Sequence, residues 1–269
     1  MAGKCMIDIV THCYAGMLKQ YAAMLNYQLS SLVLHRPERW DVRVTVCHTP
    51  DDTRTVQVVD YFTRRKELQV VPMLLAPRRL FRRSIGRNLA AMNTPADAVW
   101  FSDADHLYGE GCLDKLMPEL CRVPIDTSMV WPKFIQIHKT HELGDTLIQK
   151  QLDLGPAVLD VSPDDFMDKH YDRAIGGVQI VSGDFAREFG YLRYSKRFQR
   201  PRKDDLPFGD FWDDIYYRRF CREMGFVRQV RLPNLFRIRH TATTYQGEEN
   251  IRIGPVEGPQ EDPVVEQQQ

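Results

Sequence analysis

The sequence predicts an α/β fold built around a mainly parallel sheet. Short apolar segments rich in β-formers alternate with helical segments over about the first 100 residues, which is the pattern of strand-helix-strand units. Connections between such strands are right-handed in nearly all proteins, so successive strands join one sheet in parallel. The 269 residues are enough for one large domain with its own hydrophobic core. We therefore expect a single domain.

The first half of the chain carries the alternation. Segment 5–12 is short and apolar, and in 17–35 residues such as Leu25, Leu29 and Leu32 recur at helical spacing. Segment 40–48 alternates as a strand does, and a proline with two aspartates ends it. The predicted strands are 5–12, 40–48, 68–76 and 98–105, and the predicted helices are 17–35, 53–67 and 82–93.

The second half is less regular. Pro132 places the strand predicted over 128–138 at an edge or a bulge, because proline has no N–H to donate. The other predicted elements are a helix over 111–121, a helix over 141–152, a surface excursion over 153–173, a strand-turn-helix over 175–192, a polar segment over 193–210, a helix over 211–226 and an extended segment over 227–240. The last residues, 251–269, are rich in Pro, Glu and Gln and are predicted to be disordered.

Composition limits the classes of partner. Lys plus Arg equals Asp plus Glu at 36 each, so the overall charge gives no reason to expect a nucleic-acid or membrane partner. The six cysteines show no C-x-x-C pairing, which favours reduced thiols. No segment has the apolar length of a signal peptide core or a membrane span. We expect a soluble cytoplasmic protein.

Polar residues follow three of the predicted strands. Thr11, Asp51 with Asp52, and Asp103 with Asp105 all fall at carboxyl ends, where open parallel sheets bind their ligands. Asp103 and Asp105 follow the apolar run "AVWF", and two carboxylates so close repel each other unless a counter-ion is present. A hard divalent cation such as Mg²⁺ or Mn²⁺ takes oxygen ligands of this kind. The alternative is that the pair forms a solvated turn or a helix cap.

The stretch "RRSIGRNLAAMNTPADAVWFSDADH" resembles the core of glycosyltransferases of the A fold (GT-A), specifically family 2 and its relatives. Arg87 and Asn88 stand at the family's "RN" positions, and Leu89 replaces the glycine that usually follows. Downstream, "IGGVQIVSGDFAREFGYL" resembles part of galactosyltransferase-like C-terminal domains, and "FWDDIYYRRFCREMGF" stands where the family has its acidic motif. The segment "RIRH" matches the one whose histidine completes a metal site, which is His240 here.

The resemblance implies a single GT-A-type, Rossmann-like domain over 1–250, with its mainly parallel sheet flanked by helices. Its nucleotide-binding half is 1–108 and its acceptor-binding half is 109–250. It implies an enzyme that transfers a sugar from a nucleoside diphosphate sugar, most commonly a UDP-sugar, to a hydroxyl of a glycan or another acceptor. Direct attack by that hydroxyl would invert the anomeric centre.

The resemblance also assigns roles to single residues. Asp103, Asp105 and His240 would hold Mn²⁺ or Mg²⁺ on the donor diphosphate, and Arg87 with Arg83 would add positive charge. The acceptor hydroxyl needs a carboxylate base, for which we favour Asp213 narrowly over Asp214, while Asp210, one helical turn earlier, stays a third candidate.

Two of these roles have a structural alternative. The acids at the start of the 211–226 helix can simply cap it. The backbone near Thr11 and the side chain of Asp51 or Asp52 are candidates for contacts with the nucleotide, but "TPDDT" is equally an ordinary turn and helix start.

Two other functions compete with sugar transfer. A nucleotidyltransferase that makes sugar nucleotides also uses acidic metal ligands on an α/β sheet, but it needs a glycine-rich phosphate loop, which "THCYAG" does not supply. The second competitor is a binding protein without turnover, for a nucleotide sugar or, through the arginines of 77–87, for nucleic acid.

Overall fold

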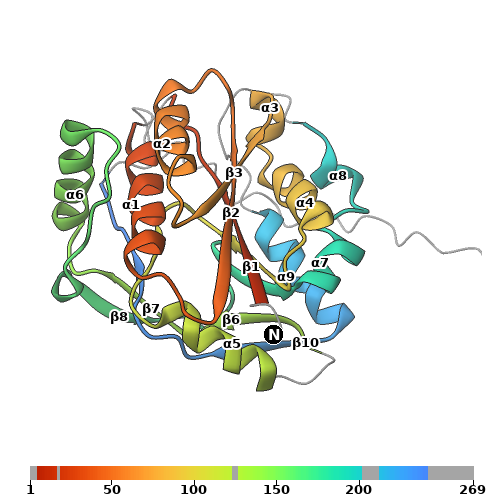
Figure 1. Cartoon of the computed structure of the whole chain (residues 1–269). Coiled ribbons are helices and arrows are strands. Elements are labelled where there is room, and N and C mark those ends of the chain that lie inside the picture. The colour runs from red at the N-terminus through yellow and green to blue at the C-terminus, as the bar shows by residue number, and fades with distance from the viewer. Residues whose placement is uncertain (1–4, 17–18, 123–126, 202–211, 242–269) are drawn as a thin grey trace, which may run out of the picture.

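The computed structural model describes residues 5–16, 19–122, 127–201 and 212–241. Its centre is a seven-stranded sheet that confirms the predicted α/β class (Figure 1). In spatial order the strands are β10 (Phe226–Val230), β6 (Thr127–Pro132), β9 (Val178–Ser182), β4 (Ala98–Ser102), β1 (Cys5–His12), β2 (Trp40–His48) and β3 (Gln69–Leu74). Strand β9 is antiparallel to both of its neighbours, and the other four pairings are parallel.

Helices cover both faces of this sheet (Figure 1). Helix α1 (Gln20–Leu34) packs on one face through residues such as Leu25 and Leu29, and α4 (Arg83–Asn93) packs on the other through Ala90 and Ala91. Every residue of β4 is buried, which is the reason for its continuous apolar run. The remaining helices are α2 (Thr53–Thr63), α3 (Pro77–Leu80), α5 (Cys112–Arg122), α6 (His141–Leu154), α7 (Gly183–Phe189), α8 (Lys196–Gln199) and α9 (Trp212–Met224).

A second sheet corrects the prediction of one strand over 128–138. The chain leaves the central sheet at Pro132, and β7 (Phe134–His138) belongs to a four-stranded sheet with the order β5-β11-β7-β8. Lys133 makes the switch: its N–H donates to Val230 in the first sheet, and its carbonyl accepts from Tyr171 just past the second. The other members are β5 (His106–Tyr108), β11 (Leu235–Arg237) and β8 (Phe166–His170).

Three further elements differ from the predictions. The excursion over 153–173 contains β8 and a short 3₁₀ helix, Pro163–Asp165, because β8 pairs with β7 in a register that the strand's own polar sequence does not reveal. The polar segment over 193–210 contains α8, and its residues from 202 onwards lie outside the described part, as does the tail over 251–269.

Cysteines with described side chains are free thiols. None of the described helices has the length and apolar character needed to cross a bilayer.

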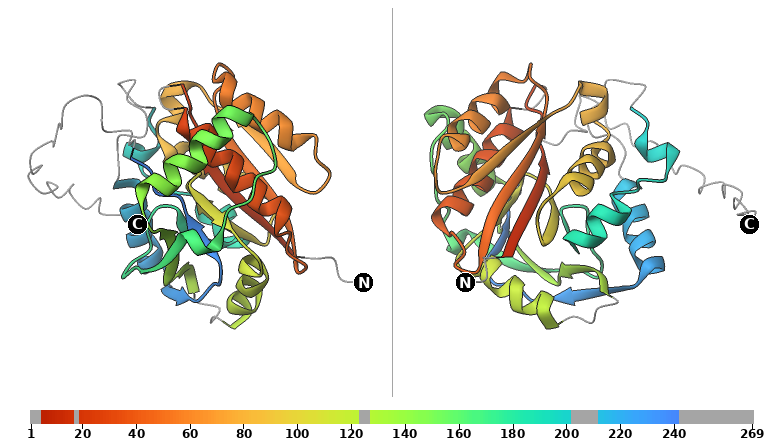
Figure 2. Two further views of the ribbon diagram at one scale, coloured as in Figure 1. Left: turned by 90° about the vertical axis from the view of Figure 1, so that its left-hand side faces the viewer. Right: turned by 45° about the vertical axis from the view of Figure 1, so that its right-hand side comes forward.

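The second sheet brings the C-terminal strand β11 to the end of β4. Strand β11 pairs with β5, which begins immediately after the Asp103–Asp105 turn, and Arg237 lies opposite His106. Figure 2 shows this C-terminal segment in blue beside the middle of the chain in green. Residues more than 130 positions apart in sequence therefore meet at the carboxyl end of β4.

Candidate active site at the carboxyl end of β4

Asp103 and Asp105 occupy a short turn between β4 and β5 whose backbone is held from two sides. Gln28 of α1 donates from Nε2 to the carbonyl of Asp103 at 2.8 Å. Ile238, just beyond β11, donates its N–H to the carbonyl of Asp105 at 2.8 Å. The turn therefore presents both carboxylates from a fixed backbone.

The Asp103 carboxylate is paired with two arginines of α4. Its Oδ1 accepts from Arg83 Nη1 at 3.2 Å and from Arg87 Nη2 at 3.1 Å. Burial acts to raise the pKa of Asp103, but the two guanidinium groups outweigh burial and hold that pKa below its usual value. Asp103 is therefore ionised at neutral pH.

The Asp105 carboxylate is paired with Arg237, a residue that the sequence analysis did not single out. Arg237 Nε donates to Oδ2 at 2.8 Å, and Nδ1 of buried His106 lies 3.0 Å from Oδ1. Burial opposes ionisation, yet Arg237 and His106 together hold the pKa of Asp105 far below its usual value. The only advance signal for Arg237 was its place in the "RIRH" segment.

Gly177 lets β9 approach this turn closely. A Cβ at this position would stand 2.9 Å from Asp103 Oδ2 and 2.5 Å from His106 Cε1. Any side chain there would push the strand away from the acidic turn. Packing therefore requires the second glycine of the "IGG" in the resembling segment.

The "RN" pair joins the two halves of the molecule. Arg87, 1% exposed, donates from Nη1 to the Tyr191 hydroxyl at 3.0 Å while it holds Asp103. The neighbouring Asn88 accepts the N–H of Tyr191 on Oδ1 at 3.1 Å. The Tyr191 hydroxyl in turn donates a hydrogen bond to Gln179 Oε1 of β9 at 3.0 Å. Through these bonds Arg87 holds both Asp103 and Tyr191, so we assign it a positioning role.

Asp213, the base that the sequence analysis favours, is buried and bonded to helix α4. It is 2% exposed, and its Oδ2 accepts the N–H of Ser84 in the first turn of α4 at 3.2 Å. Arg82 Nη1 lies 3.7 Å from its Oδ1. Helix α4 has no side-chain cap at its own N-cap residue, so Asp213 supplies one from α9. Asp213 therefore caps α4, whereas the structural alternative placed the cap on its own helix.

Asp214, the next residue, lies near the acidic turn. It is partly exposed and lies beside Gly176, whose neighbour Gly177 touches Asp103. Burial raises the pKa of its carboxyl group, against the opposing effect of Arg83 and Arg87, and Asp103 adds to the rise. A carboxylate whose proton affinity is raised is suited to act as a base. The geometry therefore favours Asp214 over Asp213.

Of the residues predicted to contact the nucleotide, one has a structural role and the others stay candidates. Asp52 is buried and caps α2 through the N–H of Thr55 at 3.3 Å, and it also accepts the N–H of Ala15 at 2.5 Å. It is thus the helix cap of the structural alternative. Asp51 is exposed in the preceding turn and stays a candidate for the nucleobase. Thr11 is fully buried, so only its backbone fits the predicted contact.

The residues present do not fit the predicted three-ligand metal site. Across residues 5–16, 19–122, 127–201 and 212–241, no three His, Cys, Asp or Glu side chains gather closely enough to hold a metal ion. His240 follows β11, and its carbonyl accepts from His141 Nδ1 at 2.9 Å. Asp103 and Asp105 face guanidinium groups, and His240 does not join them in a ligand set.

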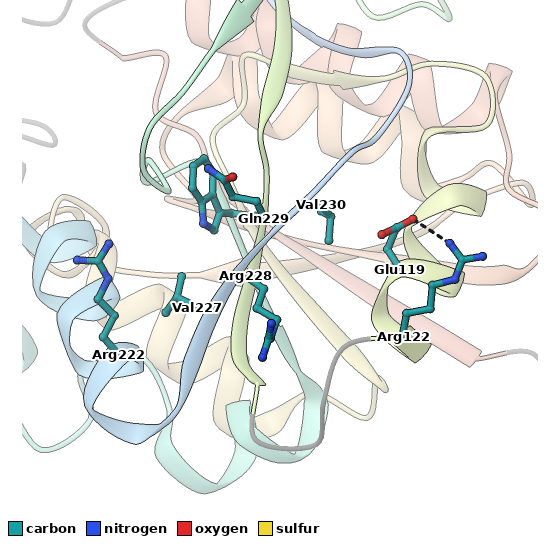
Figure 3. A pocket seen from close by; sticks show the side chains of 8 residues that line it. Glu119, Arg122, Arg222, Val227, Arg228, Gln229 and Val230 are labelled. Carbon is teal, nitrogen blue, oxygen red and sulfur yellow. Dashed lines mark hydrogen bonds and ion pairs between the residues drawn. The ribbon is translucent and has the colours of Figure 1, made fainter.

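A separate cavity lies at the β10 edge of the central sheet (Figure 3). Arg222 and Arg228 line it together with Arg122, which pairs with Glu119 at 3.4 Å. Strands β6 and β9 separate β10 from β4. None of the predicted site residues lines this cavity, so it is distinct from the candidate site.

Comparison with known proteins establishes the fold. No protein-family model and no curated protein matches the sequence. The crystal structure of S. aureus TarS aligns with a TM-score of 0.51 at 10% identity, over 87% of this chain and 36% of TarS. The chain has the fold of TarS. TarS 1–349 gives a TM-score of 0.50 at 12% identity over 86% of this chain and 60% of that one. The chain thus spans less than two thirds of either TarS chain, and the likeness confirms the predicted fold.

Proposed function

We propose that the protein is a glycosyltransferase that moves a sugar from a nucleoside diphosphate sugar, foremost a UDP-sugar, to an acceptor hydroxyl. One observation carries the proposal: at the carboxyl edge of a mainly parallel sheet, Asp214 and the arginine-paired Asp103 lie against two adjacent glycines, and burial raises the pKa of Asp214. The shared fold supports it, and TarS has been crystallised with UDP.

The chemistry follows from what the groups can do. The acceptor oxygen attacks the anomeric carbon, and the bond between that carbon and the diphosphate oxygen breaks. The diphosphate leaves with the bonding electrons, and Asp214 takes the acceptor proton. Positive groups near the leaving diphosphate lower the barrier because they stabilise charge that grows in the transition state. A single displacement of this kind inverts the anomeric centre.

Other roles remain predictions from the sequence. These are the contact of Asp51 with the nucleobase, the backbone contact near Thr11 and the division into halves at residue 108. The Mn²⁺ or Mg²⁺ requirement expected from the sequence is not part of this proposal, because the predicted ligand set is not assembled among the described residues. No step of the proposed reaction is assigned to a metal.

A donor screen tests the proposal. The full chain is mixed with UDP-, GDP- and dTDP-sugars, and both melting temperature and release of nucleoside diphosphate are measured. We expect at least one sugar nucleotide, in excess over its Kd, to stabilise the fold, by about 2.7 kcal/mol at a hundredfold excess. The same compound should be hydrolysed or transferred slowly. If no sugar nucleotide raises the melting temperature, the proposed function is wrong.

A further inference from the structure

The rim carboxylates already have counter-ions within the protein. Asp103 is paired with Arg83 and Arg87, and Asp105 with Arg237. Two carboxylates and three guanidinium groups give this cluster a net formal charge of +1. The repulsion that a D-x-D pair would suffer alone is thus relieved by side chains from α4 and β11.

This charge balance disfavours a divalent cation at the same place. Hard cations need free carboxylate or carbonyl oxygens, and Asp103 Oδ1 and Asp105 Oδ2 are engaged by arginines. Asp105 Oδ1 lies 3.0 Å from His106 Nδ1, so of the four carboxylate oxygens Asp103 Oδ2 alone has no partner among the described residues. A cation bound there would lie beside the guanidinium groups and be repelled by them. An anion, by contrast, would be attracted by the same guanidinium groups.

Two of the three arginines are placed to meet such an anion. Arg87 is 1% exposed and satisfies both Asp103 and Tyr191. The Arg83 side chain is 18% exposed and that of Arg237 is 35% exposed. Each spends one N–H on its aspartate among the described residues, and a guanidinium carries five. The remaining donors can bind phosphate oxygens in the forked geometry that arginine favours.

We propose that Arg83 and Arg237, anchored by Asp103 and Asp105, bind the donor diphosphate directly and that donor binding needs no divalent cation. The aspartates then act as positioning residues that hold the two guanidinium groups apart and aimed at the site. When the bond from sugar to diphosphate breaks, the leaving nucleoside diphosphate keeps the electron pair, and the arginines offset its added charge. This inference rests on the proposed function for its ligand.

Calorimetry on the unmodified full chain tests it without any variant. UDP, and any sugar nucleotide found in the donor screen, is titrated in buffer with Mn²⁺ and again with EDTA. We expect the same affinity in both buffers. Binding only in Mn²⁺ would overturn the inference and leave the proposed function standing. Failure to bind in either buffer would count against the proposed function itself, so the two failures are distinguishable.

Variants identify the arginines. Arg237→Ala and Arg83→Ala should each weaken UDP binding about 10- to 100-fold, the loss expected for charge-assisted hydrogen bonds. Arg237→Lys should recover part of that loss because the charge is kept and the fork is not. Arg231→Ala is the matched control, since Arg231 is exposed in the segment before β11. Unchanged affinity in both folded alanine variants would reject the assigned contacts.

Discussion

Two pairs of aspartates flank the candidate site, and they are neutralised to different extents. Both members of the Asp103 and Asp105 pair have arginine partners and depressed pKa values. In the pair on α9, Asp213 is tied to Ser84 and Arg82, whereas burial raises the pKa of Asp214. A carboxylate with close cationic partners holds other groups in position. Asp214 is partly buried and has no ion pair within the described part of the chain, so it keeps the proton affinity that a base requires.

The strongest test of this contrast is Asp214→Asn. The variant loses the base, so we expect transfer or donor hydrolysis to fall about 10²- to 10⁴-fold while UDP affinity is retained. The melting temperature should not fall, because an aspartate with a raised pKa is costly to ionise in the folded state. Steady-state rates, calorimetry and a melting curve measure the three quantities. Full activity in this variant would remove Asp214 from the mechanism.

Removal of Arg87 tests the other pair. Arg87→Ala leaves Asp103 with Arg83 alone and the Tyr191 hydroxyl without its donor. We expect a loss of about 3 kcal/mol in the free energy of unfolding, as for other broken buried ion pairs. Urea denaturation measures it, with the exposed Arg79→Ala on α3 as the control. Equal stability of the two variants would contradict the positioning role of Arg87.

Asp213→Ala should lower stability rather than activity, and by less than Arg87→Ala does. Loss of the cap on α4 should cost about 1 kcal/mol of stability. In a domain of this size that lowers the melting temperature by about 2–4 °C. UDP affinity and donor hydrolysis, measured on the folded fraction, should change far less than in Asp214→Asn. A larger loss of activity in Asp213→Ala than in Asp214→Asn would exchange the two roles.

The smallest expected effect is a displacement of the pH profile. Since Asp214 acts only when ionised, the rate should rise with pH as its proton is lost. This acidic limb should lie above the usual aspartate pKa of 3.8, because burial raises the pKa of Asp214. Stability should change in the opposite sense, with the contribution of Asp214 declining as pH rises through its folded-state pKa. In Asp213→Asn the acidic limb of the pH–rate profile should stay at the same pH. A shift of that limb in Asp213→Asn would show that Asp213, and not Asp214, is the base.

Sequence by itself determined the alternation of the central strands and long helices in the first half of the chain, although it did not predict the short elements α3 and β5. The predicted strand bounds 5–12 and 40–48 are those of β1 and β2, because alternation and apolar runs are local signals that burial in a sheet imposes. The sequence also placed the acidic pair after β4. It predicted Asp52 as a possible cap of the following helix, because a capping side chain bonds to residues close to it in sequence.

Only the tertiary structure decided what those carboxylates do. Asp103 meets Arg87 across 16 positions, and Asp105 meets Arg237 across 132. Asp213 and Asp214 are adjacent and chemically identical, yet Asp213 binds the start of α4 and Asp214 packs against Gly176, where burial raises its pKa. A side chain's charge partners and burial depend on which distant segments pack around it, and no local spacing encodes that environment.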